Sequence, residues 1–350
     1  MLQCHQQERS LPVNKELSER IPVISFLMMI EVMLYHCETL DDILPTSAID
    51  SWCSGAITDT VAAFGPLCMS WFFAVTGFLL FRNLSFQNLR KKIQSRVHSL
   101  LIPYVLWQVI YIVKSILQGN SWTVYEMIAH IFFLRVWPPL GAFWYIYAVF
   151  LLSLLSPLFL FLFRNEKLGG ISVFLLIACS CVLVRLPLIP DRGRYYYVGS
   201  ILTYFPAYIT GSFFGHLQGN SFTLSKLKHL VILLFVSRVF TGIIPSLFES
   251  ATLAALSVGM ILLMPVPEWA KNRKVYKLTF LILATHQSLI SISIHPIRHF
   301  FYSLSNSAAI AGLFGRAFCI LFIVAVNAFI HFLMNRFMPR TLKVLTGGRC

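Results

Sequence analysis

The chain has 350 residues, of which 57% are hydrophobic and only 12% are charged. Soluble globular proteins carry about 25% charged residues, so this composition excludes an ordinary soluble protein and indicates several passes through a lipid bilayer. The net charge of +14 would suggest nucleic-acid binding in a soluble chain. No nucleic-acid-binding fingerprint occurs, and an excess of basic residues in membrane loops explains the charge, so we expect no nucleic-acid partner.

Runs of about 17–25 apolar residues, separated by charged or Gly- and Pro-rich breaks, predict an all-α membrane helix bundle. The runs number about ten, and the segment 124–135 is too short to span, so it is expected to lie in the membrane interface. This division gives an N-terminal segment 1–20, a membrane domain 21–337 and a tail 338–350. The predicted spans are 21–37, 61–81, 99–118, 142–163, 171–187, 199–217, 229–246, 250–266, 278–294 and 309–334.

The basic residues favour one orientation of these helices. If the segment before the first helix faces the cytoplasm, the predicted inner segments hold twenty lysine and arginine residues and the outer segments hold five. Cytoplasmic loops of membrane proteins carry an excess of lysine and arginine, so both termini are predicted to be cytoplasmic. The first outer loop, 38–60, contains four aspartates and one glutamate and no lysine or arginine, as this orientation requires.

Two features of the predicted outer segments leave alternatives open. Arg185, Arg192 and Arg194 oppose the charge bias near the stretch PDRGRYYY. They form either a solvated loop or a basic, aromatic mouth for an anionic or sugar substrate. Cys37 and Cys53 flank the first outer loop. They are either unpaired small hydrophobic residues or the two halves of a disulfide.

Three polar residues interrupt the first predicted helix, in the stretch SERIPVISFLMMIEVMLYHC. A titratable side chain inside a membrane helix is costly and is therefore a functional candidate. His36 falls in the outer half, where a neutral imidazole can act as general base or be held structurally by a carbonyl or water. Ser25 lies eleven residues earlier, which places both side chains on one face, about 16 Å apart along the axis. Glu31 lies about 140° from His36 and is expected to face another helix.

Other polar residues in or near predicted spans also have two interpretations. His286, in ILATHQSLI, is either a functional group or a packed helix residue. Arg96 precedes Pro103 at the start of the third span, where a cation can bind a phosphate or simply flank the membrane. Lys114 and Arg238 are expected to extend toward the interface. The chain has no C-x-x-C pair and no H-E-x-x-H sequence, so neither a metal site nor a bound cofactor is predicted.

Several blocks resemble the acyltransferase 3 family of ten-helix integral membrane acyltransferases, especially bacterial members related to surface-polysaccharide modification. Together the blocks extend over nearly the whole chain, in the order found in the family. They are ISFLMMIEVMLYH, WFFAVTGFLLFRN, LRKKIQSRVHSLLIPYVLW, FWYIYAVFLLSLLSP, FLILATHQSLI and NRFMPRTLKVLTGGR. No single block carries the resemblance; their order and the number of predicted helices do.

The resemblance also implies a set of site residues. Similar family members carry an arginine, ten further residues and a histidine in the first helix, and His36 falls on this histidine, the implied catalytic residue. Ser25 stands where the arginine would be, and a serine cannot replace a guanidinium fork against a phosphate or thioester oxygen. In the fourth helix, Tyr147 and Ala148 stand where the family often has arginine and aspartate. The expected substrate-binding residues are Arg82, Arg96, Trp144, Tyr147 and His286.

The implied protein is a multi-pass enzyme of the bacterial inner membrane that transfers groups other than amino-acyl groups. It would carry an acyl group, with acetyl the first expectation, from cytoplasmic acyl-CoA to a hydroxyl of a sugar or lipid-linked glycan, as in polysaccharide O-acetylation. Two alternatives stay open. One is a catalytically impaired relative that binds or assembles surface-polysaccharide components, because Ser25 and Tyr147 depart from the family pattern. The other is a transporter or flippase, although no paired broken helices or repeated halves are visible.

Overall fold

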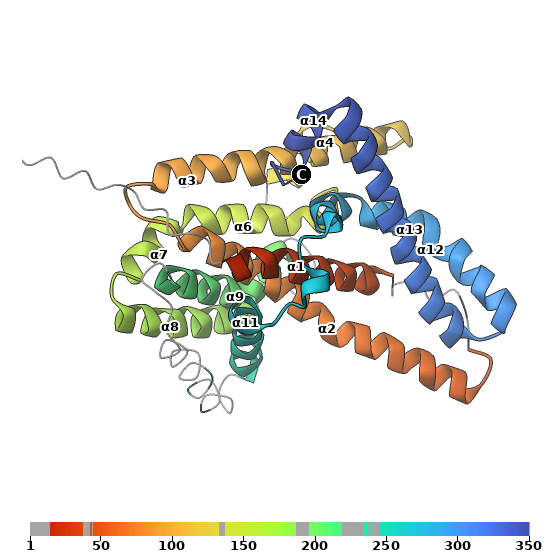
Figure 1. Cartoon of the computed structure of the whole chain (residues 1–350), viewed down its shortest axis with the longest axis horizontal. Coiled ribbons are helices and arrows are strands. Elements are labelled where there is room, and N and C mark those ends of the chain that lie inside the picture. Colours follow the sequence, from red (N-terminus) through yellow and green to blue (C-terminus); the bar gives the residue numbers. More distant parts are fainter. Residues whose placement is uncertain are drawn as a thin grey trace, which may run out of the picture.

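The computed structural model of the chain describes residues 15–37, 43, 45–132, 137–186, 196–218, 234, 236, 239 and 245–349. Within this part of the chain the regular structure is helical, as predicted. Figure 1 shows the arrangement of the elements. They are α1 (Lys15–His36), α2 (Ala48–Phe81), α3 (Leu89–Arg96), the π-helix η1 (Val97–Leu101), α4 (Ile102–Leu117), α5 (Val124–Phe132), η2 (Gly141–Phe143), α6 (Trp144–Leu154), α7 (Ser156–Leu162), α8 (Glu166–Arg185), α9 (Tyr196–Gln218), α11 (Pro245–Leu263), η5 (Glu268–Ala270), η6 (Lys274–Leu278), α12 (Thr279–Ser305), α13 (Ala308–Phe337) and α14 (Pro339–Leu345).

The positions of the helices agree closely with the predicted spans, but fewer of the helices qualify as candidate membrane crossings. Nine of the predicted spans coincide with helices, and the remaining one, 229–246, lies almost wholly outside the described residues. Among the described helices, six are long and apolar enough to cross a membrane, or seven if α6 and α7, which are bent by 54°, form one span. The chain is therefore a multi-pass membrane protein, with six or seven candidate spans in the part that the structure describes; α1 and α9 are not among these candidates, and the predicted span 229–246 lies almost wholly outside that part.

The prediction of a loop over 38–60 is wrong for its second half, because α2 begins at Ala48. Ser47 caps the helix by accepting a hydrogen bond from the Asp50 amide at 3.1 Å. The Asp50 carboxylate in turn accepts from the Ser307 hydroxyl at 2.5 Å and from the backbone amides of Ala308 and Ala309 at 2.9 Å each. A carboxylate is stabilised at a helix N-terminus, so Asp50 fastens the start of α2 to the start of α13. The beginnings of these two helices accordingly lie together at one end of the molecule (Figure 1).

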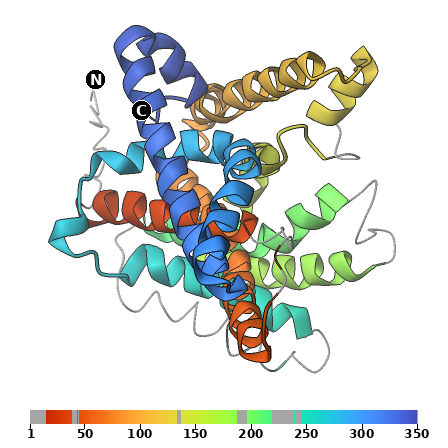
Figure 2. The same cartoon turned by 90° about the vertical axis from the view of Figure 1, so that its right-hand side faces the viewer.

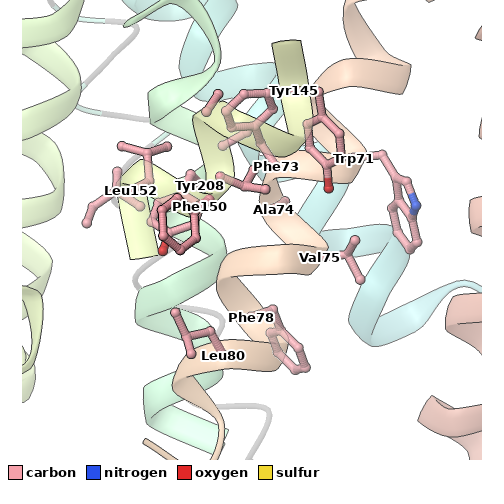
Figure 3. Close-up of a cluster of buried hydrophobic side chains, with 14 of the residues drawn as sticks. Trp71, Phe73, Ala74, Val75, Phe78, Leu80, Tyr145, Phe150, Leu152 and Tyr208 are labelled. Carbon is pink, nitrogen blue, oxygen red and sulfur yellow. The ribbon is translucent and has the colours of Figure 1, made fainter. Parts of the chain in front are cut away.

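The long helices α2 and α9 cross in close contact, and the crossing is centred on two glycines of α9. A Cβ atom on Gly211 would overlap the Ala74 carbonyl group, and one on Gly215 would overlap the Phe78 carbonyl oxygen. Glycines four residues apart allow two membrane helices to approach with their backbones in contact. The side chains around this crossing, among them Phe73, Phe78 and Tyr208, are buried (Figure 3).

A second apolar cluster joins α1, α12 and α13. Its buried members include Met33, Ile282 and Ile323. Two buried thiols belong to it, with Cys37 Sγ 3.9 Å from Cys319 Sγ. Cys37 and Cys53 are both free thiols in the structure, so it does not contain the disulfide that the sequence left open.

The segment 338–350, predicted as a tail, contains the helix α14. This helix lies against α4 beside the end of the chain (Figure 2). Leu342 and Thr346 are buried in this contact, and Trp107 Nε1 of α4 donates a hydrogen bond to the Leu345 carbonyl oxygen at 3.0 Å. The last turn of the described chain is therefore fixed against the membrane domain.

Candidate active site

A cavity of about 300 Å³ lies between α1, α2, η1, α6 and the η6–α12 segment. α1 lines it from Ile21 to His36, a distance of about 22 Å along the helix axis. Most of the wall is apolar, with Met29, Val32 and Phe72 as examples, and the polar groups stand at separate points along it. A ligand site is commonly an apolar cavity with a few placed polar groups. The shape of this one suits an extended ligand.

α1 directs two of its three polar residues to the cavity, as their spacing predicts. Ser25 and His36 both line it, whereas Glu31 does not and interacts electrostatically with Cys68 of α2. The Ser25 hydroxyl accepts a hydrogen bond from Trp71 Nε1 at 3.1 Å. Trp71 is fully buried, so Ser25 satisfies an indole N–H group that has no access to water.

His286 stands behind His36 and outside the cavity lining. The two imidazole ring centroids are 5.1 Å apart, and His286 is fully buried. Its Nδ1 lies 3.0 Å from the carbonyl oxygens of Ile282 and Leu283. A carbonyl can only accept, so Nδ1 carries the proton, and Nε2 of the neutral ring keeps its lone pair with no hydrogen-bond partner in the described structure.

Arg96 enters the cavity from the junction of α3 and η1. The five residues after it, Val97–Leu101, form a π-helix, an element that is rare and frequently found at functional sites. This wide turn joins α3 to α4 in one run from Leu89 to Leu117. Arg82, the other predicted arginine, caps the end of α2 and does not line the cavity.

Two of the expected substrate-binding residues, Trp144 and Tyr147, lie on α6, and the structure places them differently relative to the cavity. Trp144 lines the cavity. Tyr147 does not; it stacks on Tyr104 with ring centroids 5.0 Å apart and donates its hydroxyl to the Phe132 carbonyl oxygen at 3.1 Å. Tyr145 lines the cavity instead, with its hydroxyl 2.9 Å from the Phe72 carbonyl oxygen and 2.7 Å from the Thr76 hydroxyl.

The sequence prediction missed several further residues that line the cavity. The sequence marked them only weakly as site residues: Lys277 and Arg349 counted only as basic residues of the predicted cytoplasmic segments. Nothing in a single sequence places Arg349 at the wall of a cavity that α1 also lines. The missed residues are Thr76, Tyr145, Tyr276, Lys277 and Arg349.

The charges of the cavity are all of one sign. Arg96, Lys277 and Arg349 line it, and no aspartate or glutamate is among its described lining residues. Arg349 is exposed, yet the protein atoms packed around its guanidinium group desolvate it and lower its pKa to about 10, with a neighbouring Tyr145 opposing this shift and the charge of Arg96 adding to it. Arg349 therefore stays protonated at neutral pH. A histidine that can act as a base and a group of cations thus share one apolar cavity, an arrangement suited to an anionic substrate with a reactive end.

Other basic residues singled out from the sequence lie elsewhere. Lys114 does not extend freely to the interface; its Nζ is 3.3 Å from the Ser288 hydroxyl and 5.0 Å from the Tyr111 ring centroid. Arg185 is exposed at the end of α8. The predictions for Arg192, Arg194 and Arg238 fall outside the described residues.

Comparison with protein families identifies the domain that contains this cavity. The profile of the acyltransferase 3 family, described as an acyltransferase domain, matches residues 26–331. The matched range includes His36, Arg96, Trp144 and His286, but neither Ser25 nor Arg349. Comparisons with curated proteins and with solved structures find no significant match. Because the profile covers most of its length, this chain belongs to the acyltransferase 3 family.

Proposed function

We propose that this membrane acyltransferase moves an acyl group, with acetyl the first expectation, from cytoplasmic acyl-CoA to a hydroxyl of a sugar or lipid-linked glycan in the bacterial inner membrane. The observation that carries the proposal is that His36 and Arg96 line one cavity, which follows α1 for about 22 Å. Such a cavity can hold an extended thioester with its charged part near Arg96 and its acyl end near His36.

His36 is the proposed general base. Its neutral imidazole takes the proton of the acceptor hydroxyl while the hydroxyl oxygen attacks the thioester carbonyl carbon. The tetrahedral intermediate then collapses by breaking the carbon–sulfur bond. The leaving CoA thiolate takes the proton from His36, so an acyl ester and free CoA are formed and the imidazole is neutral again. His286 supports this cycle, because a neutral neighbour adds no second positive charge when His36 is protonated.

Substrate positioning is assigned to the cavity wall. Arg96 would bind a phosphate of the donor, since a guanidinium group can contact a phosphate through two parallel N–H donors. Trp144 offers an aromatic surface to the same space. Arg82, which does not line the cavity, is proposed to act only on the parts of a substrate that extend beyond it. Tyr147 is buried away from the cavity lining, and its proposed role is in the packing of α6.

A strain from which the gene has been deleted tests the proposal. Complementation with the unchanged protein should restore acyl esters on surface glycans, measured by mass spectrometry, and His36→Ala should not. His331→Ala is the matched control, because His331 lies on α13 away from the cavity lining. Both variants must be inserted in the membrane in equal amounts.

A catalytically impaired relative is the second candidate function, and Ser25 favours it because α1 offers no cation to the cavity. Full restoration of acylation by His36→Ala would support this binding or assembly role and contradict the proposed chemistry. Acyl transfer that appears only in Ser25→Arg would identify an enzyme scaffold that lacks one group. Flux of a sugar lipid through proteoliposomes without an acyl donor would instead indicate a transporter.

A further inference from the structure

We propose that Arg349 and Arg96 form one anion-binding site that takes a phosphate or pyrophosphate group at the entrance of the cavity. This inference rests on the proposed function for the source of that group, which would be the nucleotide part of a CoA thioester. The site goes beyond the matched family domain because of Arg349, which follows α14 and lies outside the range matched by the family profile.

The segment that carries Arg349 is shaped to reach the cavity. After α14, Gly347 and Gly348 adopt positive φ angles of 61° and 80°, a conformation that favours glycine. A Cβ atom on Gly347 would overlap the carbonyl oxygen of Ser99 in η1. The chain therefore turns back against the π-helix at a point where only glycine fits, and the next residue is Arg349.

The guanidinium group of Arg349 is held at the cavity wall by a few contacts. Its Nη1 donates to the Ser99 carbonyl oxygen at 2.8 Å and to the Thr346 carbonyl oxygen at 3.2 Å, and the group lies 4.8 Å from the Phe280 ring centroid. Both hydrogen bonds use the same nitrogen. A guanidinium group has five N–H donors in a rigid fork, so Nε and Nη2 can still bind a ligand.

The surroundings of Arg349 make an anion the expected ligand. The positive charge of Arg96 acts on Arg349, Lys277 lines the same cavity, and no described lining residue is a carboxylate. Like charges that meet in a partly desolvated space repel, and a bound phosphate converts this cost into charge-assisted hydrogen bonds. The backbone contacts keep Arg349 in place against this repulsion.

Calorimetric titration of the purified full-length protein tests the site with three probes: CoA, pantetheine, which lacks the phosphates and the nucleotide, and inorganic pyrophosphate. The unchanged protein should bind CoA more tightly than pantetheine. Arg349→Gln should weaken CoA binding by roughly tenfold to a hundredfold and leave pantetheine binding unchanged. Arg340→Gln, an exposed arginine of α14, is the control and should bind like the unchanged protein.

Two further variants separate the role of the charge from a folding effect. Arg349→Lys should recover part of the CoA affinity, because it keeps the charge without the fork. Gly347→Ala should weaken CoA binding although it retains Arg349. Equal affinity of Arg349→Gln and the unchanged protein for CoA would overturn the site even if acyl transfer is observed. An equal loss of affinity for CoA and pantetheine in Arg349→Gln would overturn it as well.

The source of the phosphate is a separate outcome. In one outcome the unchanged protein binds pyrophosphate but not CoA, and Arg349→Gln no longer binds pyrophosphate. The anion site then stands and the acyl-CoA assignment fails. A site for lipid headgroups would be indicated if Arg349→Gln lowers retention of phosphatidylglycerol by protein purified from mixed phosphatidylcholine vesicles, with CoA again not bound. If the unchanged protein binds none of these anions, the inference is wrong.

Discussion

The two packed regions that flank α2 use polar groups in opposite ways. At the α2–α9 crossing the backbones touch, and hydroxyls such as those of Thr210 and Ser212 donate to carbonyl oxygens of their own helix. On the α1 and α12 side a cavity separates the helices, and His36 and Arg96 line it. The difference indicates that the first region holds the bundle together, whereas the second keeps space and reactive groups for a ligand.

The largest expected effect concerns activity, and it should occur without a loss of stability. Removal of a general base typically costs roughly 10²- to 10⁴-fold in rate, so His36→Ala should lower kcat by this factor. Its melting temperature should stay near that of the unchanged protein. A kinetic assay with purified protein and a thermal shift measurement check the two halves of the statement. Loss of both activity and folding would assign His36 to the packing of the bundle.

The next effect concerns stability at the helix crossing. Gly211→Ala forces a methyl group into the Ala74 backbone and should cost about 1–3 kcal/mol of stability. Gly259→Ala is the matched control, because its new Cβ would meet nothing within 4 Å apart from its chain neighbours and the nearby backbone of its own helix. Alanine is the better helix former, so this second change should be neutral or stabilising by up to about 1 kcal/mol. Equal melting temperatures of the two variants would contradict the close approach of α2 and α9.

A smaller effect is expected where the two regions meet at Trp71. Ser25→Ala removes the oxygen that accepts the Trp71 indole N–H and should destabilise the protein by roughly 1–2 kcal/mol. Trp71→Phe should destabilise the Ser25→Ala variant less than it destabilises the unchanged protein, because the shared hydrogen bond is already lost in that variant. Strictly additive changes in a double-mutant cycle would show that the two residues are not coupled.

A comparison of two tyrosines on α6 should separate activity from packing. Tyr147→Phe loses a hydrogen bond to a backbone carbonyl and should cost about 0.5–1.5 kcal/mol of stability, whereas Tyr145→Phe loses such a bond and also the contact with the Thr76 hydroxyl and should cost at least as much. Only Tyr145 lines the cavity, so only its variant should change KM for the acyl donor, by a few fold. A KM change in Tyr147→Phe alone would place the substrate elsewhere.

The smallest effect is a local response of α5 to acid. The backbone amide and hydroxyl of Thr123 donate to Glu126, and these bonds hold the Glu126 pKa below its ordinary value of 4.5. Because the folded-state pKa is lowered, the stabilisation is present above pH 4.5 and is lost as pH falls through the lower, folded value. Amide exchange in α5 should therefore accelerate under acid, and Glu126→Gln should remove this dependence. Unchanged exchange down to acid pH would contradict the capping arrangement.

The helices were predictable from the sequence because each depends on a local run of apolar residues. The shared face of Ser25 and His36 was predictable for the same reason, since both lie on one regular helix. The start of α2 was not, because its polar first turns are stabilised by Ser307 and the amides that follow it, more than 250 residues away. Of the ten predicted spans, 229–246 lies almost wholly outside the described residues, and α1 and α9 are helices that are not among the candidate spans selected by length and composition.

The sequence predicted the positions of the helices better than it predicted which residues line the cavity. Tyr145 and Tyr147 are of the same type, two positions apart, and only the packing of α6 against α2 and α4 decides which one faces the cavity. Arg349 has no local signal, because its place depends on a glycine turn against Ser99. The sequence thus singled out His36 and Arg96, which both line the cavity, and the fold added lining groups that come from distant segments.

The length of α2 makes bilayer thickness a variable for this protein. Its 34 residues extend over about 51 Å, whereas a bilayer core is about 30 Å thick. The helix must tilt or project beyond the lipid. Because the Asp50 carboxylate binds the start of α13, a change in the tilt of α2 also moves that end of α13. A thicker membrane would change this tilt and, through α1 and α12, the width of the cavity, so the lipid composition of the host can act as a control on turnover.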